Sequence, residues 1–215
     1  HSLASGDLNS DGMTDLAFYG EPKGLYVMLQ RGDEAGEKSE ALKWRQRTKI
    51  DIEDGLPNSN GLVCADLNND GSDDLALASQ NGVYVVLQKA EGSLAEPVKY
   101  PTTATVLGVM AGDINADGIS DLIVITNDSE KPLQVRFGQS TGQLGPQVKL
   151  FIERSYALKV ENMDGLAGDE ILTVDAVSGR LICYKYVAEK KDERDWPALF
   201  YPLAGDKETT KRDLA

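Results

Sequence analysis

Residues 66–75 read DLNNDGSDDL, and this stretch determines the fold expected for the chain around it. Side-chain oxygens stand at its first, third, fifth and ninth positions, and a glycine stands at the sixth. Calcium is a hard cation that takes about six to eight oxygen ligands, so a loop that turns alternate residues inward suits it. The glycine permits the positive φ angle with which such a loop bends back on itself. The stretch therefore predicts a calcium-binding loop.

The same spacing occurs twice more without a gap, as DLNSDGMTDL at 7–16 and DINADGISDL at 113–122. A single copy would also fit a metal-free turn, because Asn, Asp and Gly are common in ordinary turns. Three copies with identical spacing favour calcium over that alternative. A backbone carbonyl at the seventh position would complete each set of ligands. The predicted ligands are Asp7, Asn9, Asp11, Met13 and Asp15 in the first loop, Asp66, Asn68, Asp70, Ser72 and Asp74 in the second, and Asp113, Asn115, Asp117, Ile119 and Asp121 in the third.

A fourth copy, NMDGLAGDEI at 162–171, has acidic residues at its third and ninth positions, Asp164 and Glu170. Its fifth and sixth positions are Leu166 and Ala167, so two features that a cation needs are missing. We expect this loop to keep the turn and to bind metal weakly or not at all.

The EF-hand is another calcium loop that begins with this spacing. It needs a bidentate Glu at position 12 and a helix on each side. Position 12 is Phe18, Leu77 or Val124 in the three complete loops. The segments that follow the loops are short, apolar and partly β-branched, which is typical of strands. Each loop is therefore predicted to join two strands.

The loops begin at residues 7, 66, 113 and 162, so the chain consists of repeats of similar length. In the second repeat, strand-like segments at 75–79 and 83–88 flank the turn Gln80-Asn81-Gly82, which is typical of a hairpin. Four short strands every ~45–50 residues are the signature of β-propeller blades. The sequence predicts an all-β protein with blades of four antiparallel strands. The four repeats are expected at about 2–52, 60–101, 106–152 and 156–203.

Residues 204–215 are expected to begin a further blade of the same protein. Their last five residues, KRDLA, are similar to the segment that precedes the first loop. The four repeats would then belong to a larger propeller. A closed ring of four blades is the alternative, because propellers of that size are known.

Composition excludes several other classes of protein. The chain has 215 residues, 41% of them hydrophobic, and a formal net charge of −13, which disfavours binding to nucleic acid. The only histidine is His1, which argues against a histidine-based catalytic triad or zinc site. No apolar run approaches the ~20 residues that span a membrane. Cys64 and Cys183 lie in strand-like segments and are expected to be buried thiols, with a disulfide as the alternative.

The three complete loops resemble those of FG-GAP repeats, which occur in integrin α-subunit propellers, and of VCBS repeats, which are common in secreted bacterial proteins. The segment VYVVLQ at 83–88 and GSLAEPVKYP at 92–101 add to the resemblance. The words FG and GAP are only half present, as Phe137-Gly138 and Gly145-Pro146, which makes an integrin-like adhesion role doubtful. The resemblance implies a propeller, usually of seven blades, with calcium in the loop between the first and second strands of a blade.

Three functions follow from these observations. The first is a calcium-stabilised propeller that binds a protein or a glycan in adhesion, with structural metal ions and no catalysis. The second is a propeller enzyme, for instance one acting on polysaccharides, although the carboxylates outside the loops are scattered. The third is a structural spacer in a cell-surface protein. A propeller fold alone does not decide among them.

The expected affinity of the loops predicts where the protein works. Each complete loop offers three carboxylates and one amide and lacks a bidentate Glu. Extracellular calcium modules work at Kd values of ~10⁻⁴–10⁻³ M, and such sites would stay empty in the cytosol. We therefore expect an extracellular, cell-surface or periplasmic protein, with an export signal upstream of His1 in the gene.

Overall fold

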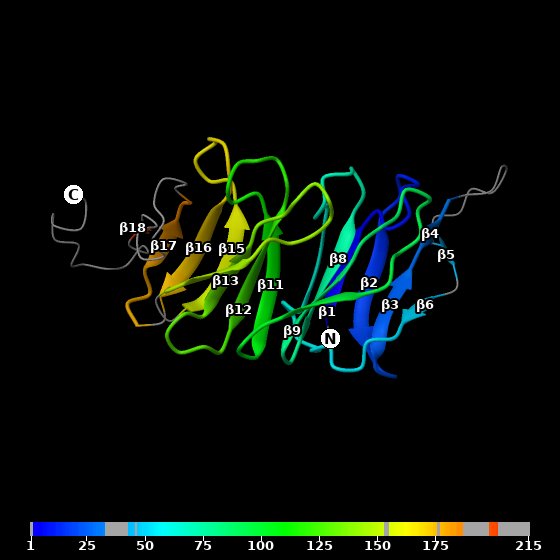
Figure 1. The fold of residues 1–215 in the computed structure, drawn as a ribbon, viewed down its shortest axis with the longest axis horizontal. Coiled ribbons are helices and arrows are strands. Elements are labelled where there is room, and N and C mark those ends of the chain that lie inside the picture. The colour runs from blue at the N-terminus through cyan, green and yellow to red at the C-terminus, as the bar shows by residue number, and fades with distance from the viewer. Residues whose placement is uncertain are drawn as a thin grey trace.

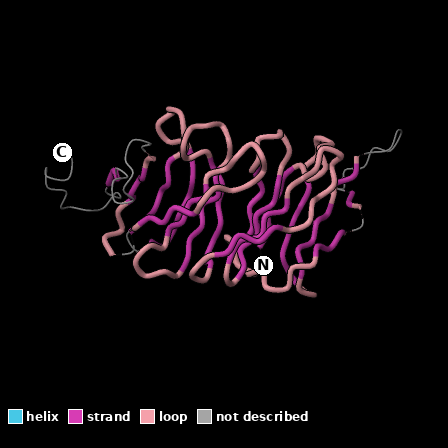
Figure 2. The backbone as a smooth tube through the Cα atoms, in the orientation of Figure 1, coloured by secondary structure: helices cyan, strands magenta, loops and turns pink. Residues whose placement is uncertain are grey.

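The computed structural model describes residues 2–32, 43–45, 47–152, 155–175, 177–186 and 198–201. The described residues form strands and loops without a helix, as Figure 2 shows. The strands make four antiparallel sheets of four strands and one small sheet of two. The predicted fold class, all-β with four-stranded sheets of the kind that form propeller blades, is confirmed. No helix among the described residues is long and apolar enough to cross a membrane.

We name the four large sheets blades 1 to 4 in chain order. Blade 1 contains β1 (Ser2–Gly6), β2 (Asp15–Gly20), β3 (Gly24–Met28) and β6 (Thr48–Ile50). Blade 2 contains β7 (Leu62–Ala65), β8 (Asp74–Ser79), β9 (Gly82–Val86) and β10 (Val98–Pro101). Blade 3 contains β11 (Val106–Gly112), β12 (Asp121–Thr126), β13 (Leu133–Arg136) and β14 (Gln147–Leu150). Blade 4 contains β15 (Ser155–Glu161), β16 (Glu170–Asp175), β17 (Leu181–Tyr184) and β18 (Ala198–Tyr201).

Within each blade the strands pair in sequence order, so the sheet is a simple meander. Figure 1 shows the blades following one another across the molecule, from blade 1 in blue to blade 4 in orange. The first strands β1, β7, β11 and β15 contact one another from blade to blade. Neighbouring candidate loops, each of which follows a first strand, are therefore brought close together.

The second strand of blade 2, β8, is buried on both faces, which explains its continuous apolar sequence. Every residue of β8 is buried. Leu75 and Leu77 belong to the core that blade 2 shares with blade 1, whereas Ala76 and Ala78 belong to the core shared with blade 3. Alternate residues of a strand point to opposite faces. One face of β8 therefore carries large side chains and the other small ones.

The outer strands of blades 1 and 2 are largely exposed, because each has a paired neighbour on one side only. In β10, Val98, Lys99 and Pro101 are exposed, and in β6, Thr48 and Lys49 are exposed. A short hairpin, β4 (Gln30–Arg31) with β5 (Lys43–Trp44), was not predicted. It flanks residues 33–42, which lie outside the described part of the chain, as does the predicted start of a further blade at 204–215.

The two cysteines are free thiols, as predicted. Cys183 is buried, and Cys64 is half-buried on the third residue of β7. Burial raises the pKa of the Cys64 thiol to about 12, so the thiol stays protonated at neutral pH.

Candidate metal centres

The three complete loops each join the first strand of a blade to the second. The ninth residue of each loop, an aspartate, is also the first residue of the second strand. These three aspartates are fully buried, whereas the fifth-position aspartates are exposed. Each loop therefore runs from solvent at its tip to the interior of a blade at its end. The buried residues are Asp15, Asp74 and Asp121.

The first aspartate of each loop closes the turn through its own carboxylate. In the second loop, Oδ2 of Asp66 accepts a 2.9 Å hydrogen bond from the N–H of Gly71, and Oδ1 accepts one of 3.2 Å from the N–H of Asp70. Gly71 has φ of 84°, in the left-handed region that favours glycine. Asp7 and Asp113 accept the corresponding bonds in the other two loops.

The other predicted ligands also take part in each loop's internal hydrogen bonds. The amide Nδ2 of Asn68 donates to Oδ2 of Asp70 at 3.0 Å, and the N–H of Ser72 donates to Oδ1 of Asp70 at 2.9 Å. The same pairs recur as Asn9 with Asp11, Met13 with Asp11, Asn115 with Asp117, and Ile119 with Asp117. The three loops therefore share one conformation as well as one sequence pattern.

The buried ninth aspartate ties the loop to the third strand of its blade. One oxygen of Asp74 accepts a 3.0 Å bond from the N–H of Leu67, and the other accepts a 2.7 Å bond from the N–H of Gln88, just after β9. Asp15 and Asp121 make the corresponding bonds to Leu8 and Gln30, and to Ile114 and Gly138. These aspartates hold the loop in place within its blade.

Burial makes the negative charge of these aspartates costly. It raises the pKa of Asp74 to about 6, and the neighbouring carboxylates of Asp70 and Asp66 add to the shift. Burial likewise raises the pKa of Asp121 to about 6, with Asp117 contributing. A nearby cation would offset this cost, since opposite charge favours the ionised form of a carboxyl group.

The donor chemistry of the loops fits calcium, because every predicted side-chain donor is an oxygen. Within the described residues, however, no three Asp, Glu, His or Cys side chains are gathered closely enough to form a ready-made metal cluster. The donors stand in the order that a calcium loop requires without being drawn around one point. Each carboxylate oxygen has two acceptor sites, so its bond to an N–H does not exhaust its capacity.

Neighbouring loops are linked to one another, which the sequence interpretation missed. The side chain of Gln88 donates from Nε2 to the backbone carbonyl of Asp7 at 2.8 Å, and its Oε1 accepts a 2.5 Å bond from the hydroxyl of Ser10. In blade 4, Oδ2 of Asp169 accepts a 2.9 Å bond from the N–H of Asp113. Asp169 is the eighth residue of its loop, and an acidic residue at that position is the signal in the sequence.

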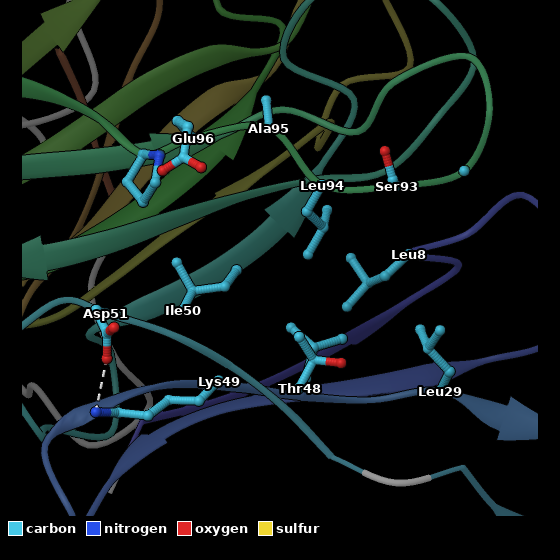
Figure 3. Close-up of a pocket in the computed structure, with 13 residues that line it drawn as sticks. Leu8, Leu29, Thr48, Lys49, Ile50, Asp51, Ser93, Leu94, Ala95 and Glu96 are labelled. Atoms are coloured by element: carbon cyan, nitrogen blue, oxygen red, sulfur yellow. Dashed lines mark ion pairs between the residues drawn. The ribbon is translucent and has the colours of Figure 1, made fainter.

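A groove of about 560 Å³ lies between blade 1 and the connection from β9 to β10 in blade 2. Figure 3 shows the side chains of Leu8, Ile50 and Leu94 directed into it. Lys49 and Asp51 form an ion pair of 2.7 Å at its edge. Its lining mixes apolar and polar side chains and includes no aromatic residue. It touches the first candidate loop through Leu8.

Comparison with known proteins gives a family for part of the chain. Residues 66–124 match the family model described as an FG-GAP-like repeat, a range that includes the second and third loops. No curated protein matches the chain.

The chain was also compared with solved structures, and two of the matches are described here. One is described as the structural basis of specific recognition of non-reducing terminal N-acetylglucosamine by an Agrocybe aegerita lectin. Its TM-score is 0.60 at 13% identity, and the match covers 91% of this chain and 50% of the lectin chain. This chain therefore spans about half the length of that relative. A second is the Photorhabdus luminescens Tc holotoxin pore, with a TM-score of 0.37 at 13% identity, covering 94% of this chain and 12% of the other.

Proposed function

We propose, from the FG-GAP-like repeat at residues 66–124, that this chain is a calcium-stabilised β-propeller module that binds a glycan or a protein outside the cell. The metal ions serve the structure, and the module is not an enzyme. One observation carries the proposal: three loops with the same oxygen donors share the same internal hydrogen bonds at the same place in three successive blades.

The loops are placed to stabilise the assembly of blades. A cation held by Asp66, Asn68, Asp70 and Asp74 would neutralise carboxylates at the start of β8, the buried strand that contacts both neighbouring blades. The third loop has the same relation to β12, which belongs to the cores on both sides of blade 3, and the first loop precedes β2, which belongs to the core between blades 1 and 2. Calcium would therefore stabilise the cores between blades, and the surface of the blades would be left for recognition.

A glycan is the ligand class that we favour, with a protein as the alternative. The support comes from the fold shared with a lectin that recognises terminal N-acetylglucosamine. An extracellular location agrees with this proposal, because calcium modules that work outside the cell bind the ion at ~10⁻⁴–10⁻³ M. A strongly acidic surface, with a net charge of −13, is consistent with either ligand.

The calcium part of the proposal is tested by isothermal titration and by thermal unfolding. We expect calcium to bind and to raise the melting temperature, because at ~100 Kd of free ligand each site contributes ~2.7 kcal/mol to folding. EDTA should reverse the effect, and magnesium should not replace calcium. An unchanged melting temperature after EDTA treatment and calcium repletion would refute the metal sites.

The binding part is tested on a glycan array that includes sugars ending in N-acetylglucosamine. Calcium-loaded protein should retain a defined group of glycans and should lose them when EDTA loosens the blades. A catalytic role would instead be revealed by the release of shorter sugars from polysaccharide substrates during prolonged incubation. Absence of any glycan binding by folded, calcium-loaded protein would favour a protein ligand.

A further inference from the structure

A lysine that follows β17 lies against the carboxylates of the fourth loop. The ammonium Nζ of Lys185 lies 2.5 Å from Oδ2 of Asp164 and 2.8 Å from Oε1 of Glu170. Asp164 is the third residue of the loop and Glu170 the ninth, so Lys185 bridges two positions that hold ligands in the complete loops. The Glu170 side chain is 2% exposed, so this ion pair is buried at one end.

Strand register identifies the residues that replace Lys185 in the other blades. The second residue of the second strand pairs with Met28 in blade 1, Val86 in blade 2, Arg136 in blade 3 and Tyr184 in blade 4. The next residue in each case is Leu29, Leu87, Phe137 or Lys185. The first three are partly buried hydrophobic residues that contact the cores between blades. Among the four described blades, lysine therefore occupies this position only in blade 4, whose loop lacks the fifth-position carboxylate and the sixth-position glycine.

The hydrogen bonds of the loop's ninth residue differ between the second and fourth loops. In the second loop, both oxygens of Asp74 accept backbone N–H groups, from Leu67 and Gln88. In the fourth loop, Oε2 of Glu170 keeps the bond to the N–H of the second residue, Met163, at 2.8 Å, and Oε1 accepts a bond from the ammonium of Lys185 at 2.8 Å. The longer glutamate side chain thus meets a longer basic side chain.

The net charge at the ligand positions alone is conserved by this replacement. Three aspartates and one divalent ion would leave one net negative charge in a complete loop. Asp164, Glu170 and the Lys185 ammonium also leave one net negative charge. With Lys185 present, the fifth position does not have to supply a ligand, and Leu166 there is 63% exposed. The N–H of Leu166 donates a 2.9 Å hydrogen bond to Oδ1 of Asp164.

We propose that the ammonium group of Lys185 takes the place of the metal ion in the fourth loop, so that blade 4 keeps this loop folded without calcium. The comparison with metal rests on the function proposed for the other three loops. The contact of Lys185 with Asp164 and Glu170 is independent of that proposed function. Lys185 is thus the residue that sets the metal dependence of blade 4.

Hydrogen exchange measured by mass spectrometry on the full chain tests this assignment. We expect Lys185→Met to speed exchange in the segment 162–171 by about tenfold or more, because the buried carboxylate of Glu170 would lose its charged partner. The effect should be the same in calcium and in EDTA. Lys159→Met is the matched control, because Lys159 pairs with Glu161 at 2.5 Å on an exposed surface of the same blade, and it should leave 162–171 unchanged. Equal exchange in native protein and Lys185→Met would overturn the proposal.

A second variant tests whether ammonium and metal are interchangeable. Leu166→Asp and Ala167→Gly, added to Lys185→Met, give the fourth loop the fifth and sixth residues of the complete loops. Protection of 162–171 should return with calcium and disappear with EDTA. If calcium does not restore the protection of 162–171 in this variant, the proposal that Lys185 takes the place of a metal ion is wrong. If EDTA does not change hydrogen exchange in loops 7–15, 66–74 and 113–121 of the native chain, the proposed calcium sites are wrong. The effect of Lys185→Met on exchange in 162–171 still decides the role of Lys185 in that case.

Discussion

The backbone N–H of Asp7 donates a 2.8 Å hydrogen bond to Oδ2 of Asp73, so the first residue of one candidate loop is held by the eighth residue of the next. These residues are 66 positions apart in the chain. Asp7 also accepts the bonds that close its own turn. We therefore expect a change at Asp73 in blade 2 to affect the candidate metal loop of blade 1.

Asp73→Ala should destabilise the protein and weaken calcium binding to the first loop. The substitution removes a charged acceptor from a partly buried N–H, which costs ~1.5–3 kcal/mol. The free energy of unfolding from urea titration in calcium measures this loss. Thr14→Ala is the control, because Thr14 is exposed at the same position of the first loop, and we expect a change within about 0.5 kcal/mol. Equal effects of the two substitutions would show that the link between the loops has no energetic weight.

Gly92→Ala should lower the stability of the protein by more than the strain of a positive φ angle alone would. Gly92 has φ of 77°, and a Cβ atom there would lie 2.4 Å from the backbone oxygen of Asn9 in the first loop. Gly179 has φ of 69° with nothing within 4 Å of its Cβ position, so Gly179→Ala measures the conformational cost alone. That cost is ~1–2 kcal/mol.

The clash at Gly92 adds a displacement of backbone, for which overpacking costs of ~1–3 kcal/mol are typical. We expect the midpoint of chemical unfolding to fall further for Gly92→Ala than for Gly179→Ala. Calcium titration should also show weaker binding for Gly92→Ala alone, because Asn9 is a predicted ligand. Similar unfolding midpoints for the two variants would mean that the first loop moves to accommodate the added methyl group at little cost.

Much of the fold could be predicted because its determinants are local. The spacing of Asp, Asn and Gly marks each loop, and the apolar segments after the loops mark the buried second strands. The small hairpin of β4 and β5 was missed, because each of its strands has two residues and carries no periodicity. A strand of that length is stabilised by pairing rather than by its own sequence.

The links between loops could not be predicted, because they depend on which blades are neighbours. Asp73 looks like a solvated charge until blade 1 is placed beside it. Lys185 was missed for another reason. It lies 15 residues after Glu170, whereas Leu29 lies 14 residues after Asp15 and Phe137 lies 16 residues after Asp121. The hairpins differ in length, so the correspondence appears only through strand register.

Leu77→Ala should strongly destabilise the boundary between blades 1 and 2. Leu77 is fully buried in that core, and replacing a buried leucine by alanine typically costs ~2–5 kcal/mol. Leu3→Ala is the control, since Leu3 is 60% exposed on β1, and it should change stability by about 0.5 kcal/mol or less. Urea unfolding in EDTA separates this effect from calcium binding. A small loss for Leu77→Ala would indicate that the blades repack around the cavity.

Asp70→Ala and Asp164→Ala should differ in how their effects depend on calcium. Asp70 is the fifth residue of a complete loop, so its removal should abolish the calcium contribution of that loop, ~2.7 kcal/mol at ~100 Kd of free calcium. In EDTA the same substitution should cost much less, because it also removes repulsion between Asp70 and the buried Asp74.

Asp164 lies in the fourth loop, where Lys185 holds the pKa of its carboxyl below the usual range. Asp164→Ala leaves Lys185 paired with Glu170, a loss that involves no metal ion. Its effect on the melting temperature should therefore be the same in calcium and in EDTA. Measuring both variants in both buffers gives the comparison directly. A calcium-dependent loss for Asp164→Ala as large as that for Asp70→Ala would mean that the fourth loop binds metal despite Leu166 and Lys185.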